Sequence, residues 1–376
     1  MALTLLGLAI GFGLAAIYPY VIYPLLLRLL PRRPLRIDDA APPVSATLVF
    51  CAFNEERSLP AKLENLRAIR AVAPDVKFMA YVDESTDATL QILSAETDLV
   101  DVIAAKERTG KAVGMRRLAQ EAQTEVLIFT DANVTVEPDS IKRLLAYFKD
   151  PDVGGVCGTL IYTNGAESVT ARMGSVYWRL EEFIKQGESR SGSTMGADGS
   201  LFATRRALYP EVPSHLLDDF IVSMSVIFDG RRLVSAADVI AYERTSAVPQ
   251  DEFRRKRRIA CRAYASHVYL WPQLVKMPAG AFAKYISHRL MRWYSGFNVL
   301  LCLIFALLFV GAQWGGLAAF AFLLAAVATY GLGRLANLPP LSHMTEAATA
   351  IYAASLGLVD AWRGKRYQTW QPVQTR

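Results

Sequence analysis

Residues 126–133, with the sequence VLIFTDAN, constrain the fold of this chain more than any other stretch. The first five are apolar, β-branched or aromatic, and they predict a buried strand. Asp131 and Asn133 follow at its carboxyl end, the edge at which open α/β sheets bind their ligands. Two oxygen-bearing side chains at this spacing suit a hard divalent cation that also binds substrate phosphates. An ordinary Asp-Ala-Asn turn is the alternative, because Asp and Asn side chains bond their own backbone.

Strands and helices alternate on the amino-terminal side of this stretch. Residues 46–53 and 76–82 predict two further strands, and a short one is expected near residues 100–103. Apolar residues at helical spacing follow the first strand and the second. This alternation predicts a parallel, doubly wound α/β sheet flanked by helices, which binds nucleotides at its carboxyl edge.

Two acidic pairs stand at the ends of predicted elements. Asp83 and Glu84 end the second strand, and Asp218 and Asp219 precede a helix. Both pairs have an ordinary structural explanation, because acidic residues cap helix N-termini and interact favourably with the helix dipole.

A basic run covers residues 254–258 and contains Arg255 and Arg258. In a helix it projects several cations toward one spot. A solvated or lipid-facing charged surface is the ordinary explanation for such a run. Each of these motifs is common alone, whereas their occurrence together in this order is not.

The apolar residues are concentrated at the two ends of the chain. Hydrophobic residues make up 52% of 376 residues and the mean hydropathy is +0.22, which is too apolar for a soluble enzyme of this size. Residues 3–27 carry no charge and are long enough to cross a bilayer. Arg28, Arg32, Arg33 and Arg36 follow, and such positive charges predict that the next part of the chain is cytoplasmic.

Two uncharged segments near the carboxyl end, residues 297–312 and 317–333, predict a membrane hairpin. Residues 344–359 are apolar but short and contain Glu346, so a re-entrant or interfacial helix is expected rather than a third span in this region. Ahead of the hairpin, basic residues mix with aromatics, which is typical of a helix on the membrane surface with Tyr285, Trp293 and Tyr294 at headgroup depth. The predicted divisions are an anchor (1–36), a cytoplasmic domain (37–275), an interfacial helix (276–296) and a hairpin with helix and basic tail (297–376).

The charge distribution and the cysteine spacing limit which binding partners, metal sites and disulfides the chain can have. The net charge of +6 is carried largely beside the apolar segments, which favours attraction to anionic lipid over nucleic acid. The four cysteines form no Cys-x-x-Cys pair. They therefore predict neither a zinc site nor a disulfide framework, as is typical of a reducing compartment.

Taken in order, the motifs resemble the membrane-bound bacterial members of the inverting family 2 glycosyltransferases of the GT-A fold. The resemblance covers roughly residues 44–262 and is specific as an ordered set. The matching segments are Cys51-Ala-Phe-Asn-Glu55, Asp83-Glu-Ser-Thr-Asp87, Asp131-Ala-Asn133, Leu217-Asp-Asp219 and Arg255-x-x-Arg258.

The resemblance implies a role for each of these residues. Asp83 would contact the nucleotide base or ribose, and Lys111 would lie beside the nucleotide. Asp131 and Asn133 would meet Mg²⁺ or Mn²⁺ and the donor diphosphate. Asp219 would be the general base and Arg258 would hold the departing pyrophosphate. The remaining substrate-binding residues of the implied set are Glu84, Asp218 and Arg255.

Two departures from the family pattern refine this expectation. Family members typically carry Asp-x-Asp, and the amide of Asn133 supplies no charge, so weaker metal binding is expected. Processive members carry a tryptophan where this chain has Ile259, which argues against threading of a polymer.

The sequence thus predicts an inverting, hexosyltransferase-type enzyme of polysaccharide biosynthesis in the cell membrane. It would transfer a sugar from a nucleotide-diphosphate donor to a lipid-linked or polysaccharide acceptor. A processive polysaccharide synthase is the alternative among enzymes. A membrane scaffold that binds nucleotide sugar without turnover is the alternative from another class.

Overall fold

The computed structural model describes residues 1–164, 168–244, 248–336 and 340–369. A single eight-stranded sheet forms in the order β3-β2-β1-β4-β7-β6-β8-β5. The strands are β1 (Ala46–Ala52), β2 (Lys77–Val82), β3 (Asp101–Ala104), β4 (Val126–Asp131), β5 (Thr135–Val136), β6 (Val153–Tyr162), β7 (Leu201–Arg205) and β8 (Arg232–Glu243). The helices that pack on it are α3 (Leu59–Val72), α4 (Thr89–Ser94), α5 (Lys111–Glu121), α6 (Pro138–Tyr147), α7 (Val169–Arg190) and α8 (Asp218–Phe228). α9 (Pro249–Leu274) packs in turn against α8.

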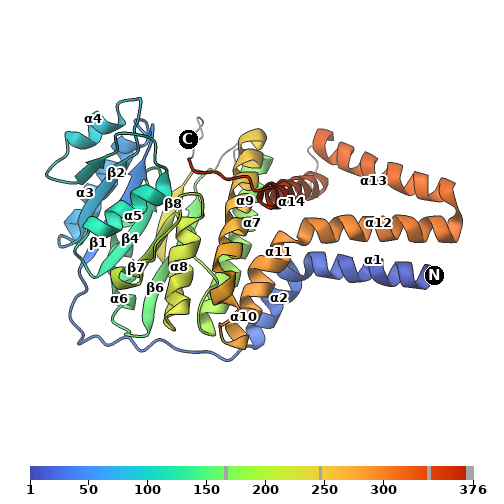
Figure 1. Cartoon of the computed structure of the whole chain (residues 1–376), viewed down its shortest axis with the longest axis horizontal. Helices are drawn as coiled ribbons and strands as arrows, with labels where there is room; N and C mark the ends of the chain where they lie inside the picture. The colour runs from blue at the N-terminus through green and yellow to red at the C-terminus, as the bar shows by residue number, and fades with distance from the viewer. Residues whose placement is uncertain (165–167, 245–247, 337–339, 370–376) are drawn as a thin grey trace.

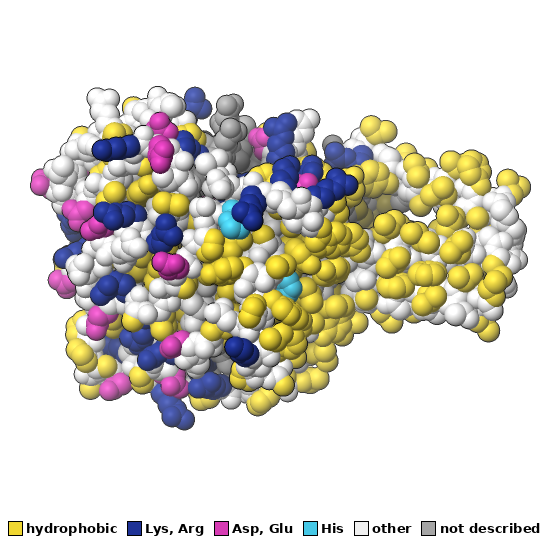
Figure 2. All heavy atoms as spheres, in the orientation of Figure 1, with side chains coloured by type: hydrophobic (Ala, Val, Ile, Leu, Met, Phe, Trp, Pro, Cys, Tyr) yellow, Lys and Arg dark blue, Asp and Glu magenta, His cyan; other side chains and the backbone are white. Residues whose placement is uncertain are grey.

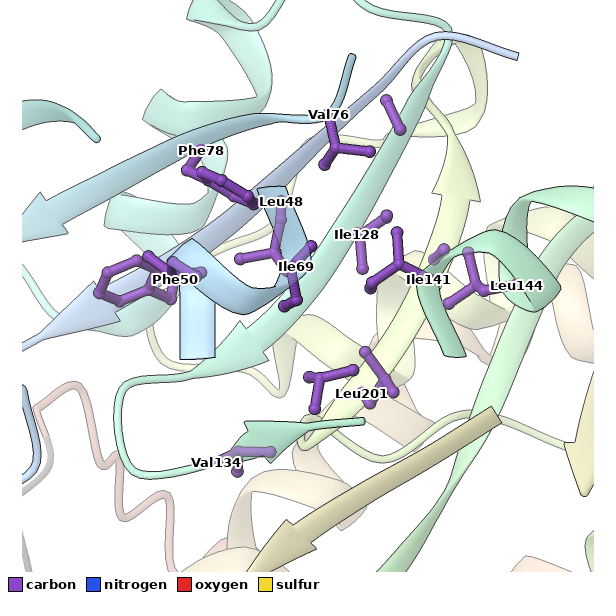
Figure 3. Packing of buried hydrophobic residues seen from close by; sticks show 14 of the residues in the cluster. Leu48, Phe50, Ile69, Val76, Phe78, Ile128, Val134, Ile141, Leu144 and Leu201 are labelled. Atoms are coloured by element: carbon purple, nitrogen blue, oxygen red, sulfur yellow. The ribbon is translucent and has the colours of Figure 1, made fainter. Parts of the chain in front are cut away.

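Both faces of the sheet are covered, which explains the unbroken apolar runs of its central strands. Leu48 and Phe50 of β1 point into one core, together with residues of α3 and α6, as Figure 3 shows. The alternate residues Val49 and Cys51 belong to a second core that includes α5 and α8. The predicted strand at residues 126–130 is confirmed as β4, in the middle of this α/β arrangement.

The sheet is mixed: the parallel arrangement predicted from the alternating strands and helices is confirmed for the strands up to residue 131, and an antiparallel strand joins them from the later part of the chain. β3, β2, β1 and β4 are parallel, whereas β7 runs antiparallel to β4 and β6. The reason lies in the chain between α7 and β7. Residues 191–200 pass beside β8, where Thr194 N donates to Leu233 O at 2.9 Å. They return the chain to the carboxyl edge of β4, so β7 begins at that edge and runs the opposite way.

Long apolar helices extend from one side of the α/β body (Figure 1). They are α1 (Ala2–Ile17), α12 (Ser295–Trp314) and α13 (Gly316–Ala336). α1 lies beside α12, where the rings of Phe12 and Phe305 stack at 5.6 Å. Figure 2 shows hydrophobic side chains covering these helices and charged ones covering the body. Within the described ranges, Ala2–Leu29, Ser295–Trp314 and Gly316–Leu335 are long and apolar enough to span a membrane, which suggests membrane association.

The segment predicted to lie on the membrane surface also packs against α7 and α9. It forms α10 (Ala279–Tyr285), a π-helical turn and α11 (Met291–Trp293). Tyr285 is fully buried and its hydroxyl lies 2.7 Å from Nδ1 of His267 on α9, so its ring contacts the protein interior. The basic residues of the segment bind groups of α7: Lys284 donates to the Glu188 carbonyl and Arg292 pairs with Glu181.

α14 (Leu341–Trp362) covers the residues predicted to form a re-entrant or interfacial helix. It lies against α9, and the Asp360 carboxylate accepts two hydrogen bonds from the Arg257 guanidinium, at 2.6 and 2.8 Å. Gly357 approaches the α9 backbone so closely that a Cβ atom would collide with the Arg257 carbonyl. The helix is therefore fixed to the α/β body.

Candidate active site

The turn that follows β1 and the turn that follows β2 interlock at the carboxyl edge of the sheet. Asn54, after β1, adopts a left-handed backbone with φ of 53°. This conformation is tolerated by Asn, and it aims both ends of the amide at the turn after β2. Nδ2 donates to Thr86 Oγ1 at 3.1 Å and Oδ1 accepts from Thr86 N at 2.8 Å. Glu84 lies exposed in that turn. Its side chain thus faces solvent beside the predicted nucleotide site.

The Asp83 carboxylate is sealed inside the protein. It is 0% exposed and accepts hydrogen bonds from the backbone N–H groups of Thr109 at 2.7 Å and Gly110 at 3.0 Å. The Arg108 guanidinium adds an ion pair at 2.9 Å. Asp83 therefore fixes the loop that leads into α5, and its predicted contact with the nucleotide would act through this loop, not through a free carboxylate.

Three charged groups from distant elements converge beyond the end of β4. Lys111, the first residue of α5, places Nζ 2.5 Å from Oδ1 of Asp131. A Cβ atom at Gly199 would lie 3.1 Å from both Lys111 Nζ and Asp219 Oδ2, so that glycine leaves room for the two charges to approach. Burial alone would lower the pKa of Lys111, but the carboxylates of Asp131, Asp218 and Asp219 raise it. Lys111 therefore stays cationic among the carboxylates.

Asp218 and Asp219 occupy the first turn of α8, as the sequence predicts. Oδ1 of Asp219 accepts the Phe220 N–H at 2.7 Å, which leaves Oδ2 directed toward Lys111 and Gly199. Burial, followed by the charge of Asp218, raises the pKa of Asp219 to about 7. A carboxylate with this pKa can accept a proton near neutral pH.

α9 supports the acidic pair through two residues that the sequence analysis did not single out. Arg262 donates from Nη2 to the Leu216 carbonyl, and its charge lowers the pKa of Asp219, against the larger effect of burial. Ser266 accepts the Leu217 N–H at 2.9 Å. Helical spacing could have pointed to Arg262 in the sequence, since it follows Arg258 by four residues and so lies on the same face of the helix.

Asn133 lies on the other side of the β4 turn. Its Nδ2 donates to Oε1 of Glu243, at the end of β8, at 3.1 Å. Arg255 of α9 is near Glu243: burial alone would lower the Arg255 pKa, but the charges of Glu252, Tyr162 and Glu243 raise it. Glu243, a carboxylate that the sequence analysis missed, thus holds the Asn133 amide and adds to the negative charge around Arg255.

The backbone after Asn133 is held by α3. Nζ of Lys62, 1% exposed, donates to the Val134 carbonyl at 2.8 Å. The Asn65 amide bonds both backbone groups of Val136, at 2.6 and 2.9 Å. These contacts fix the path of the chain just after the two oxygen-bearing side chains.

The chain is similar in sequence to known proteins. Residues 47–212 match the model of the family described as Glycosyl transferase family 2. The chain therefore resembles this family over that range. The O-antigen chain rhamnosyltransferase RfbN of Salmonella typhimurium is 23% identical over 220 residues, which cover 56% of this chain and 69% of that protein. The O-antigen chain rhamnosyltransferase WbaN of Salmonella anatum is 23% identical over 180 residues, which cover 46% of this chain and 57% of that protein.

The fold of the chain is also that of a solved structure. The mannosyltransferase PcManGT from Pyrobaculum calidifontis, in complex with GDP-Man and Mn²⁺, superposes with a TM-score of 0.75. Its sequence is 20% identical, and the match covers 96% of this chain and 99% of that one. The mixed sheet is therefore of the GT-A type, flanked by helices and framed by long apolar helices at both ends.

Asp131 and Asn133 can each offer an oxygen ligand to a divalent cation, and substrate phosphates would supply further ligands. No cluster of three or more His, Cys, Asp or Glu side chains suited to a metal occurs in the described part of the chain. Mg²⁺ needs only one or two carboxylates when substrate phosphates supply further oxygens. Asp131 offers Oδ2, because Oδ1 accepts from Lys111. Asn133 offers Oδ1, because Nδ2 is held by Glu243.

The pH profile of the chain's activity should report Asp219. Below its pKa of about 7 the carboxyl retains its proton and cannot accept another, so kcat/KM should fall about tenfold per pH unit on the acid side. Asp218→Asn removes a charge that raises this pKa, and the acid limb should move to lower pH. Steady-state rates of both proteins across the pH range test this. Asp229→Asn, at the far end of α8, is the control. An acid limb that stays in place in Asp218→Asn would contradict the assignment.

Proposed function

We propose that the chain is an inverting glycosyltransferase that moves one sugar from a nucleotide-diphosphate donor to a lipid-linked saccharide. The observation that carries this proposal is the convergence of Lys111, Asp131 and Asp219 at the carboxyl edge of the sheet. The site combines a cation, a partly exposed carboxylate and a carboxylate with a pKa near neutrality. Sugar transfer needs this combination, since a leaving diphosphate must be neutralised and an acceptor hydroxyl must lose a proton.

The chemistry assigns one proton transfer to Asp219. Its carboxylate takes the proton of the acceptor hydroxyl while that oxygen bonds to the anomeric carbon of the donor sugar. The bond from this carbon to the diphosphate oxygen breaks on the opposite side, so the configuration inverts without a covalent enzyme intermediate. As in inverting hydrolases, one carboxylate acts as the base and no second carboxylate is needed as a nucleophile.

The chain's cations would stabilise the departing diphosphate. Lys111 is held in the site by Asp131. Arg258 lies one turn before Arg262, on the α9 face that supports the Asp218–Asp219 turn. A guanidinium presents a fork that matches phosphate oxygens. A bound Mg²⁺ or Mn²⁺, held by Asp131 and Asn133, would add positive charge against the diphosphate.

A membrane-bound acceptor is favoured by the way the apolar helices join the catalytic body. α14 comes after α13 in the chain and packs on α9, the helix that carries Arg258 and Arg262. The two matched relatives are O-antigen chain rhamnosyltransferases, a name that is compatible with a lipid-linked saccharide acceptor. The basic residues after the first apolar helix favour a cytoplasmic catalytic domain, where nucleotide sugars are available.

The acceptor assay tests this function. With one donor selected from a screen of UDP-, GDP- and TDP-sugars, the purified full chain should glycosylate a lipid-linked saccharide at least about tenfold faster than the free oligosaccharide, since binding energy from the lipid contributes to the transition state. Measuring kcat/KM for both acceptors decides the matter. Equal values would refute the lipid-linked acceptor, and donor binding without transfer to any acceptor would support the scaffold alternative. Protease cleavage of the central domain from outside intact cells would refute the cytoplasmic placement.

A further inference from the structure

A cavity of about 380 Å³ lies where the end of the first apolar helix meets α7, outside the candidate active site. Leu27, Arg28 and Arg32 line it from the amino-terminal segment. Phe183, Gly187 and Arg190 line it from the last turns of α7. Figure 1 shows the short helix α2 (Tyr23–Leu26), which leads into this segment, at the junction of the body and the projecting helices. The cavity therefore has arginines on both of its sides and apolar side chains between them.

The three arginines of this cavity have no anionic partner among the described residues. The Arg28 guanidinium lies over the Phe183 ring, with Cζ 5.4 Å from the ring centre. Neither Arg32 nor Arg190 makes a side-chain hydrogen bond or ion pair within the described ranges, whereas the adjacent Arg33 pairs with Asp152 at 3.1 Å. Like charges around one cavity repel each other. A bound anion would turn that repulsion into attraction.

The cavity lies at a depth where the anion can be a lipid phosphate. The apolar segment Ala2–Leu29 has 28 residues. Its straight part, α1 (Ala2–Ile17), has 16 residues and is about 24 Å long, close to the hydrocarbon thickness of about 30 Å. The chain then bends through a π-helical turn into α2 (Figure 1). The carboxyl end of the segment, with Arg28, thus extends to the headgroup region. Leu29 and Leu30 are exposed there, at 80% and 40%, beside the arginines.

We propose that this cavity binds the headgroup phosphate of an anionic phospholipid from the surrounding membrane. Guanidinium groups of Arg28, Arg32 and Arg190 would bond the phosphate oxygens, because Arg forms charge-assisted, bidentate hydrogen bonds with phosphate. Leu27 and Phe183 would contact the first methylenes of the acyl chains. Basic pockets at this depth are typical sites for lipid headgroups.

Such a lipid would join the amino-terminal helix to the catalytic body. α7 approaches that helix closely: a Cβ atom at Gly187 would lie 3.0 Å from Leu27 Cδ1. One residue on, the Glu188 carboxylate accepts a hydrogen bond from the Tyr23 hydroxyl at 2.6 Å and lies 3.0 Å from Nδ1 of His288. The lipid would add a third contact to a junction that these buried groups already form.

The test uses the full chain in phosphatidylcholine nanodiscs with increasing fractions of phosphatidylglycerol. The Tm should rise with the anionic fraction and reach a plateau, which gives an apparent affinity. Arg190→Gln should weaken that affinity about fivefold, the effect expected for one arginine near a membrane surface. Arg190 is remote in sequence from the apolar helix, so its replacement leaves the charges that direct membrane insertion unchanged. Arg28→Gln should produce the same loss, and it replaces Arg190→Gln if that variant does not fold.

Arg363→Gln is the matched control, because Arg363 is exposed at the end of α14 and does not line the cavity. It should retain the affinity of the unaltered protein. An equal loss in this control would show general attraction to the surface and overturn the site. An unchanged affinity in Arg190→Gln would overturn it as well. Inorganic phosphate added to pure phosphatidylcholine discs should not raise the Tm, and a comparable rise would reject a lipid as the ligand.

Discussion

Asp219→Asn should lower kcat by about a hundred- to ten-thousand-fold, the usual contribution of a general base. The amide has nearly the shape of the carboxylate, and its oxygen can still accept the Phe220 N–H that now bonds Oδ1. It cannot take a proton from the acceptor hydroxyl. Donor affinity should therefore survive while turnover is lost. Steady-state kinetics with isothermal titration of the donor nucleotide separate the two quantities.

The control for this variant is Asp229→Asn, on the same helix and remote from Lys111. It should keep normal turnover. Near-normal turnover in Asp219→Asn would remove Asp219 as the base. A parallel loss of donor affinity would show instead that the residue acts in binding.

Asp131→Ala should abolish metal-dependent donor binding. Losing even a group that only supports a metal ligand typically costs ten- to a hundredfold in metal affinity, so loss of this carboxylate should cost about a hundredfold or more. Asn133 would remain as the single ligand of the pair, and it carries no charge. Titration of UDP or GDP with and without Mn²⁺ measures the effect in both proteins.

Asp139→Ala provides a matched comparison, because Asp139 is an exposed carboxylate in the first turn of α6. It should bind the nucleotide as the unaltered protein does, with the same dependence on Mn²⁺. Equal nucleotide affinity with and without Mn²⁺ in the unaltered protein would contradict the assignment of a metal site. Unchanged nucleotide binding in Asp131→Ala would contradict the role of Asp131 and would leave Lys111 as the group that neutralises the diphosphate.

Lys111 also explains why Asp131 and Asp219 can lie near one another in the folded chain. Its half-buried ammonium group is paired with Asp131 and adjoins Asp219, and together the carboxylates raise its pKa against the effect of desolvation. The same arrangement leaves Asp219 with a raised pKa, since burial and Asp218 outweigh the nearby cation. The candidate base is thus tuned by its neighbours in space, and only Asp218 among them is close in sequence.

Patterns within single elements were enough to predict the strands and helices of the nucleotide-binding half. β1 and β4 are buried on both faces, so they read as continuous apolar runs, and α3 shows its buried face at helical spacing. The same holds for the long apolar helices, whose length and lack of charge are local properties. The acidic motifs could be placed at the carboxyl edge because parallel strands all end there.

Contacts between segments far apart in sequence decided the remainder. The direction of β7 depends on the return of residues 191–200 beside β8. The enclosure of Asp83 depends on a loop 26 residues away, and the burial of Tyr285 depends on a hydrogen bond to His267. Glu243 reaches Asn133 across 110 residues. Side-chain polarity predicts which groups need partners, but the partner that each one finds is set by packing, because burial makes every unpaired charge or polar atom costly.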